Sequence, residues 1–170
     1  MANTYTAIAT VTVGSGGAST IEFTSIPGTY TDLLIKFSLR TTGAGNYTNN
    51  RFTFNGSTSG YSSKLLYGDG SSAASANNSV TDKIDYSAYS TEAGATASTF
   101  SNGEAYIPNY VGSNNKSISV DHVSENNATG AIAAMTAGLW SNTAAITSVT
   151  INGGSFVQYS TATLYGIKNS

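Results

Sequence analysis

The only histidine of the chain, His122, directly follows an aspartate, Asp121. An imidazole oriented by a carboxylate is the usual core of a proton-transfer site. Consecutive residues of a β-strand point to opposite faces of the sheet, however, so these two side chains cannot pair with each other. A triad of His122, a distant aspartate and one of the many serines stays open, although the sequence has no G-x-S-x-G nucleophile elbow. We expect a structural or surface histidine, no catalytic residue and no enzymatic activity.

Two pairs of acidic residues lie close together in the sequence, as the carboxylates of a glycosidase do in space. Asp82 and Asp85 are three residues apart, a spacing that places them on opposite faces of a strand. Asp121 and Glu125 are four apart, but Glu125 adjoins Asn126-Asn127, where we expect a turn. We interpret the acidic residues as groups that keep a weakly charged surface soluble.

The sequence also lacks complete motifs for binding metals or phosphates. Cysteine is absent, so neither disulfides nor cysteine-zinc sites support the fold. Asp69-Gly70 lacks the ladder of Asp and Asn residues and the closing Glu of an EF-hand. The glycine-rich run at residues 14–17 lacks the Gly-Lys-Ser/Thr end of a phosphate-binding loop. We expect no cofactor and no metal, with calcium bound by loop oxygens left open.

Tyrosine is the most frequent aromatic residue, with 11 copies against 6 Phe and one Trp. Five tyrosines lie in or beside polar segments rich in Asn, Ser and Gly: Tyr47, Tyr61, Tyr86, Tyr89 and Tyr110. Tyrosine in such surroundings supplies contact area at a low cost in side-chain entropy, as in antibody loops, and it can stack on a sugar ring. The alternative is that these rings cover sheet edges or pack between subunits. The sequence therefore predicts them as surface or subunit contacts.

Composition sets limits on the elements that position these side chains. The chain has 170 residues and a formal net charge of -2, with 39% hydrophobic and only 9% charged residues. A packed core is therefore possible, whereas a basic patch for nucleic acid and an apolar stretch of about 20 residues for a membrane helix are both lacking. We expect one domain over residues 1–170, no nucleic-acid partner and no membrane. The first residues lack a signal-peptide pattern, so we expect synthesis in a cytoplasm.

Alternation of apolar and polar residues is the dominant pattern, and it predicts strands throughout. It is clearest from Leu33 to Arg40, where Ile35, Phe37 and Leu39 are expected in the core. The predicted strands fall within residues 5–13, 20–26, 33–40, 51–54, 63–67, 80–86, 104–107, 116–124, 131–140, 146–151, 156–159 and 163–167. Short strands at intervals of about 8–15 residues, without a convincing helix, are typical of a β-sandwich or barrel.

This pattern predicts an all-β fold, a two-sheet antiparallel β-sandwich that is jelly-roll-like, with a single Greek-key sandwich as the alternative. The strands near Tyr5 and Ile167 are expected to be neighbours, because the terminal strands of sandwiches often lie close together. Residues 68–79 and 91–98 are predicted as long exposed connections, and Asn152-Gly153-Gly154 as a hairpin turn.

Five segments carry a further similarity: Phe23 to Lys36, Tyr106 to Tyr110, Ser124 to Thr129, Gly138 to Ser148 and Gln158 to Lys168. Their strand and turn phrases resemble those of small β-rich virion structural proteins of tailed bacteriophages from aquatic bacteria. The resemblance runs along the whole chain and is least in residues 46–97. It implies a non-enzymatic particle component, either a capsid decoration protein or part of a tail or fibre appendage, and it assigns no functional residues.

Two functional hypotheses follow. The first is a virion structural protein, made in the bacterial host cytoplasm and exposed on the virion surface, with other virion proteins as partners. The second is a carbohydrate-binding or receptor-binding module for host surface glycan, although Trp140 is alone in an apolar run and is expected in the core. Few charges keep copies of the chain apart, so we expect a homo-oligomer, a trimer or a symmetric array. Its contacts are expected at the loops 68–79 and 91–98 or at edge strands.

Overall fold

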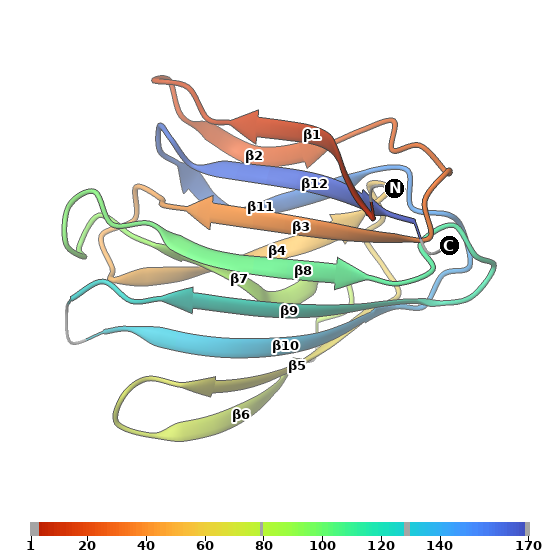
Figure 1. The fold of residues 1–170 in the computed structure, drawn as a ribbon. Helices are drawn as coiled ribbons and strands as arrows, with labels where there is room; N and C mark the ends of the chain where they lie inside the picture. Colours follow the sequence, from red (N-terminus) through yellow and green to blue (C-terminus); the bar gives the residue numbers. More distant parts are fainter. Residues whose placement is uncertain (1–3, 79, 128–129, 169–170) are drawn as a thin grey trace.

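The computed structural model describes residues 4–78, 80–127 and 130–168, which form two antiparallel β-sheets (Figure 1). The larger sheet has the spatial order β1 (Tyr5–Thr12), β12 (Thr161–Ile167), β3 (Asp32–Leu39), β8 (Ser101–Ile107), β9 (Lys116–Ser124), β10 (Ile132–Trp140), β5 (Tyr61–Gly68) and β6 (Ala73–Asn78). The smaller sheet has the order β2 (Ala18–Phe23), β11 (Val149–Phe156), β4 (Tyr47–Phe54) and β7 (Ile84–Thr91). The all-β sandwich predicted from the sequence is confirmed. No helix among these residues is long and apolar enough to cross a membrane.

The strand order is that of a jelly roll with two inserted hairpins. The layer β1-β12-β3-β8 packs on the layer β2-β11-β4-β7, and the chain crosses repeatedly between the two layers, as in two Greek keys. The hairpin β5–β6 follows β4 and the hairpin β9–β10 follows β8. Both hairpins join the larger sheet, where β10 pairs with β5, so this sheet extends beyond the smaller one (Figure 1).

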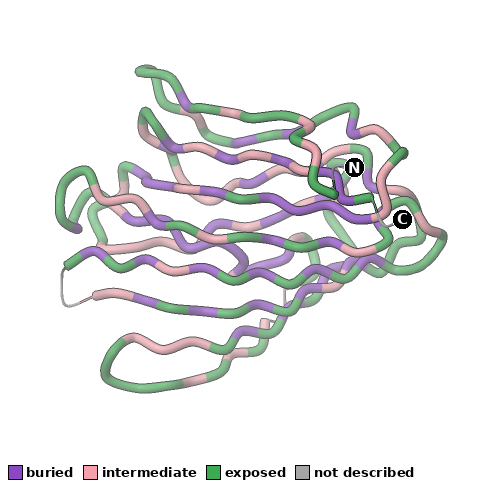
Figure 2. Tube along the Cα trace, viewed as in Figure 1, coloured by how far each residue is buried: buried purple, intermediate pink, exposed green. Residues whose placement is uncertain are grey.

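The main core lies between the two sheets, and the two-residue period of the strands creates it. Ile35, Phe37 and Leu39 of β3 are at most 4% exposed, as predicted, whereas Lys36 between them is exposed. The smaller sheet closes the core from the other side, where the Phe52 ring lies 6.3 Å from the Phe37 ring, measured between centroids. Figure 2 shows the same alternation of buried and exposed residues along the strands of the larger sheet.

The two ends of the chain are joined by strand pairing. β1 pairs antiparallel with β12, from Tyr5 opposite Ile167 to Thr12 opposite Thr161. β12 in turn pairs with β3, so that the last strand lies between the first and the third. The predicted neighbourhood of the terminal strands is confirmed.

The prediction of a long loop at residues 68–79 is wrong, because half of this segment is strand β6. Ala73–Asn78 pairs with β5 in unbroken register, from Ala73 opposite Gly68 to Asn78 opposite Ser63. The turn between the strands is short, and the Asp69 carboxylate accepts hydrogen bonds from the backbone N–H groups of residues 71 and 72. Small, polar residues resembled a loop because β6 is an edge strand with no large core side chain to supply. Ser79 lies outside the described residues.

The predicted hairpin turn at Asn152-Gly153-Gly154 is also wrong. These residues lie within β11, where the pairing with β2 becomes irregular between Asn152 and Phe156. Gly153 has a φ of 139°, and a Cβ at this position would come within 2.7 Å of the backbone of Asn50. The glycine therefore permits a close approach between β11 and β4 instead of a reversal of the chain.

The connection predicted at residues 91–98 is present after Thr91, the last residue of β7, and it is anchored to the sandwich. Arg40 as a whole residue is 8% exposed. It donates hydrogen bonds to the carbonyl oxygens of Thr96, at 3.0 Å, and Thr99, at 2.7 Å. A buried cation whose N–H groups are taken up by loop carbonyls fixes the path of that loop.

Candidate functional site

His122 lies inside the core, where it is 1% exposed. Its Nδ1 accepts a hydrogen bond of 3.3 Å from the backbone N–H of Tyr89, and its Nε2 lies 3.5 Å from the hydroxyl of Thr136. Burial lowers the pKa of His122 to about 4, and a hydrogen bond to the backbone of Tyr86 opposes that shift only in part. Asp121 lies on the exposed face of the same strand. Of the two expected positions, structural or surface, His122 takes the one inside the core.

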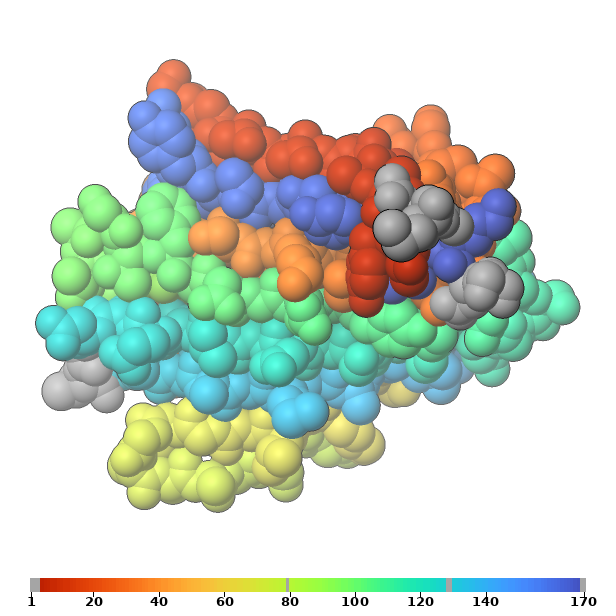
Figure 3. All heavy atoms as spheres, viewed as in Figure 1, coloured from red at the N-terminus to blue at the C-terminus, as the bar shows by residue number. Residues whose placement is uncertain are grey.

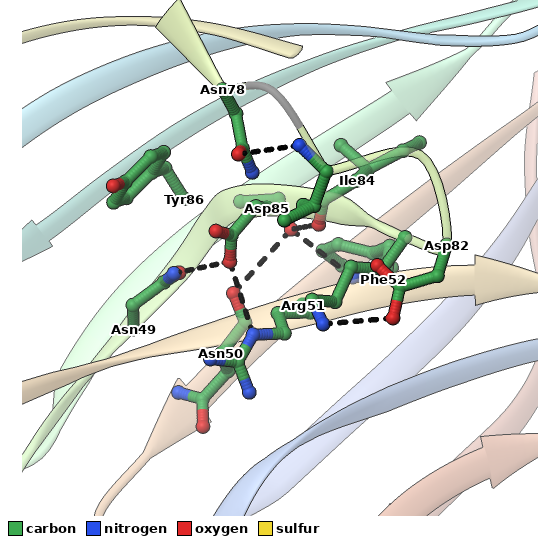
Figure 4. A network of polar contacts seen from close by, with 12 residues as sticks. Asn49, Asn50, Arg51, Phe52, Asn78, Asp82, Ile84, Asp85 and Tyr86 are labelled. Carbon is green, nitrogen blue, oxygen red and sulfur yellow. Dashed lines mark hydrogen bonds and ion pairs between the residues drawn. The ribbon is translucent and has the colours of Figure 1, made fainter. Parts of the chain in front are cut away.

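Asp82 and Asp85, which are three residues apart in the sequence, each form an ion pair with a different cation. Asp85 is 9% exposed and its Oδ1 lies 3.0 Å from the Nε of Arg51, while Asn49 donates to the same oxygen (Figure 4). Asp82 pairs with the neighbouring Lys83 at 2.9 Å. Figure 4 shows the resulting network between β4 and the start of β7, in which each of the two carboxylates faces a cation. The Arg51–Asp85 ion pair ties β4 to β7, and both carboxylates are already paired with cations instead of with each other.

Two of the five predicted contact tyrosines belong to the main core. Tyr61 is 2% exposed, its ring stacks on Trp140 with centroids 6.0 Å apart, and its hydroxyl accepts a 2.8 Å hydrogen bond from the backbone N–H of Phe54. Tyr110 is fully buried, and its hydroxyl donates to the carbonyl oxygen of Pro27. The prediction that these two rings form surface contacts is therefore wrong, whereas the core position of Trp140 is confirmed.

The other three predicted tyrosines come together in a second, smaller cluster beneath β5 and β10. Tyr89 is 7% exposed, and Tyr47 meets its ring edge-on with centroids 5.4 Å apart. Burial raises the pKa of Tyr89 above its usual value. Tyr86 and Tyr67 pack partly buried against the same cluster. The surface prediction is thus wrong for Tyr89, while Tyr47 and Tyr86 keep part of their surface exposed.

The outer face of the larger sheet carries a different set of tyrosines, which we call the tyrosine row. Leu34 of β3 lies directly opposite Tyr106 of β8 on one side and Tyr165 of β12 on the other. Tyr5, at the start of the edge strand β1, is 58% exposed and Tyr106 is 37% exposed. Leu34 between the rings is 8% exposed. These strands are far apart in sequence and lie side by side on the face shown in Figure 3.

The ring of Tyr106 is held by its hydroxyl. It donates a 2.8 Å hydrogen bond to Oδ2 of Asp32, whose Oδ1 accepts a 2.9 Å bond from the backbone N–H of Asn109. Asp32 is itself 4% exposed. The hydrogen bond to Asp32 is the main reason that the pKa of Tyr106 is raised. An exposed aromatic ring is thereby fixed in orientation before any ligand arrives.

A polar row runs beside the tyrosine row, two residues away from it on each strand. Lys36 and Glu104 are directly opposed on β3 and β8, with Nζ and Oε2 3.2 Å apart and both side chains more than half exposed. On the other side of Lys36, Thr163 bonds to Thr10 through their hydroxyls at 3.0 Å. Same-face neighbours along a strand are about 7 Å apart, so apolar rings and hydrogen-bonding groups form parallel bands.

Two shallow grooves cross this face. One, of ≈ 660 Å³, is lined by the tyrosine row together with Ile167, Lys36 and Glu104. The other, of ≈ 400 Å³, continues over β9, β10 and β5 and is lined among others by Leu66 and Met135. Tyr106 and Glu104 line both grooves, so the two adjoin. Both volumes lie in the range of small-molecule sites.

Sequence reasoning missed the tyrosine row because it looked for tyrosines in polar loops. A usable signal was present: Tyr106 alternates with the core residues Ala105 and Ile107, and Tyr165 with Leu164 and Gly166. Such a position predicts a ring on the outer face of a strand. No local pattern in the sequence indicates that β12, β3 and β8 are neighbours in the sheet.

Within the part of the chain that the structure describes, no three His, Asp or Glu side chains form a group that could hold a metal ion. Comparison with models of protein families, with curated proteins and with solved structures found no match.

Proposed function

We propose that this chain is a non-enzymatic structural protein of a bacteriophage particle, exposed on the virion surface as a capsid decoration or tail/fibre component. Its site of synthesis would be the cytoplasm of the bacterial host. The virion part of the proposal is supported by the resemblance of the five sequence segments to small phage structural proteins. A cysteine-free jelly roll that positions exposed side chains on a broad sheet suits such a role.

The observation that carries the non-enzymatic part is the position of His122. The single imidazole of the chain is buried, and Tyr89 and Thr136 lie within hydrogen-bonding reach of its two nitrogens. The buried carboxylate Asp85 is neutralised by Arg51. A general acid or base must reach a substrate, and these groups do not.

Mass spectrometry of purified particles, followed by imaging of the particle with the protein labelled, tests the virion role. We expect the chain among the particle proteins and the label on the outside. Its absence from particles of a phage that encodes it would overturn the proposal. Turnover of envelope polysaccharide, lipid or peptide that disappears in His122→Ala would overturn the non-enzymatic part.

Copies of the chain are the first partners that we propose, with β6 as the contact. The other three edge strands carry features that discourage pairing with a further strand. β1 contains a bulge between Ala7 and Ala9, and β2 carries the charge of Glu22. β7 is irregular opposite residues 50–52 and has a left-handed residue, Tyr86, with a φ of 55°. β6 has neither charge nor bulge, so its edge supports strand pairing with a second copy.

Light scattering across a concentration series tests this contact, with Ser75→Lys on β6 as the disrupting variant. Two copies paired through β6 would bring the introduced ammonium groups together and should dissociate. Ser19→Lys on β2 is the matched control and should leave the mass unchanged. A wild-type protein that stays monomeric in solution and on the particle, or an oligomer that Ser75→Lys leaves intact, would contradict the contact through β6.

A second candidate function is a carbohydrate-binding or receptor-binding module. One observation favours it: the tyrosine row and the polar row together expose aromatic rings beside hydrogen-bonding groups. The two functions are compatible if a particle component also binds host glycan.

A further inference from the structure

We propose that the groove of the tyrosine row binds a neutral oligosaccharide. This inference deepens the second candidate function and does not depend on the virion role. The site consists mainly of Tyr5, Leu34, Tyr106 and Tyr165, with Lys36 and Glu104 beside them.

The rings supply the apolar part of the recognition. Tyr106 and Tyr165 are on either side of Leu34, two strand spacings of about 4.8 Å apart, so a ligand lying between them meets a ring at each side and an apolar floor. A pyranose ring has an apolar face of C–H groups that packs on such surfaces. The Tyr106 ring is already fixed through Asp32, so little side-chain entropy is lost on binding.

The polar row supplies hydrogen-bonding groups for the hydroxyls of the ligand, and its charges indicate which ligand charge is preferred. Lys36 offers hydrogen-bond donors and Glu104 offers acceptors, and Thr163 adds a hydroxyl. The lining of the groove holds one cation and one anion, already paired at 3.2 Å, and so has no net charge to attract a phosphate or an acidic polymer. A neutral ligand rich in hydroxyl groups complements both properties.

The extent of the face favours a chain over a single sugar. The second groove adjoins the first at Tyr106 and Glu104, and together they cross the sheet from β1 to β5. Six strand spacings of about 4.8 Å separate these two strands, which gives a path of roughly 29 Å. We therefore expect affinity to rise with oligosaccharide length.

The test is titration calorimetry of the whole chain with a panel of neutral hexasaccharides: maltohexaose, cellohexaose, mannohexaose and hexa-N-acetylchitohexaose. We expect at least one to bind, and the corresponding disaccharide to bind more weakly. Tyr106→Ala and Tyr165→Ala should each weaken binding about tenfold, since one aromatic contact is removed. Tyr106→Phe keeps the ring and loses its anchor to Asp32, so its loss should be smaller than that of Tyr106→Ala.

Tyr159→Ala is the matched control. Tyr159 is 67% exposed and precedes β12, at the end of that strand opposite to Tyr165 and Ile167. Thermal melting of each variant separates loss of binding from loss of fold. The proposal is overturned if no member of the panel binds at about 1 mM ligand, or if Tyr159→Ala weakens binding as much as Tyr106→Ala. It is also overturned if light scattering shows an oligomer that Tyr106→Ala dissociates, because a second copy would then cover the groove.

The glycan-binding test and the search for the chain in purified particles are independent of each other. A chain that is found on virions but ignores the whole panel leaves the virion role standing, and a chain that binds glycan but is absent from virions leaves this site standing.

Discussion

Lowering the pH should destabilise the protein through His122. The pKa of this residue is about 4 in the folded protein, against 6.5 for an unperturbed histidine. The folded state therefore binds fewer protons than the unfolded state over the interval between these values. The contribution of neutral His122 to the free energy of unfolding is fully present above pH 6.5 and is lost progressively as the pH falls towards 4.

The size of the effect follows from the same two values. A shift of one pKa unit corresponds to about 1.4 kcal/mol, so the complete loss is about 3 kcal/mol. Between pH 7 and pH 5, where most carboxylates stay charged, the expected decrease in the free energy of unfolding is about 2 kcal/mol. Structurally, protonation of Nδ1 would break the hydrogen bond from Tyr89 and place a charge inside the core.

Urea unfolding at pH 7 and pH 5, for the wild type and for His122→Gln, measures the contribution of His122 to the free energy of unfolding. A glutamine can still accept the hydrogen bond from Tyr89 and does not titrate, so the variant should be less stable at pH 7 but nearly independent of pH. The difference between the two proteins isolates His122 from the carboxylates. Equal losses of stability in both proteins between pH 7 and pH 5 would refute the reasoning.

Three further substitutions test the packing. Phe37→Ala should lower the free energy of unfolding by about 3–5 kcal/mol in urea titrations, since it leaves a cavity between the sheets, and an unchanged midpoint would show that the ring is not in the core. Arg40→Met should speed proteolysis within residues 92–100, because their carbonyl groups lose a donor; unchanged cleavage would mean that the guanidinium does not hold the loop. Gly166→Ala should cost about 1–3 kcal/mol in thermal unfolding, as its Cβ would overlap the ring of Tyr30, and a neutral result would contradict that contact.

The sequence by itself determined the fold class and the interior of the best strands. Alternation is a local property, so Ile35, Phe37 and Leu39 could be placed in the core without knowing any partner strand. The absence of a nucleophile elbow is also a property of the sequence alone.

Only the tertiary structure decided which tyrosines are exposed. Tyr61 and Tyr110 come from polar segments, yet both are buried because the backbone of residues 54 and 27 satisfies their hydroxyl groups. Tyr106 and Tyr165 come from ordinary strands, yet strand order brings them to either side of Leu34. Likewise β6 is a strand because β5 offers it a partner, despite a composition typical of loops. Strand order and hydrogen-bond partners join residues distant in the sequence, and local alternation contains no information about them.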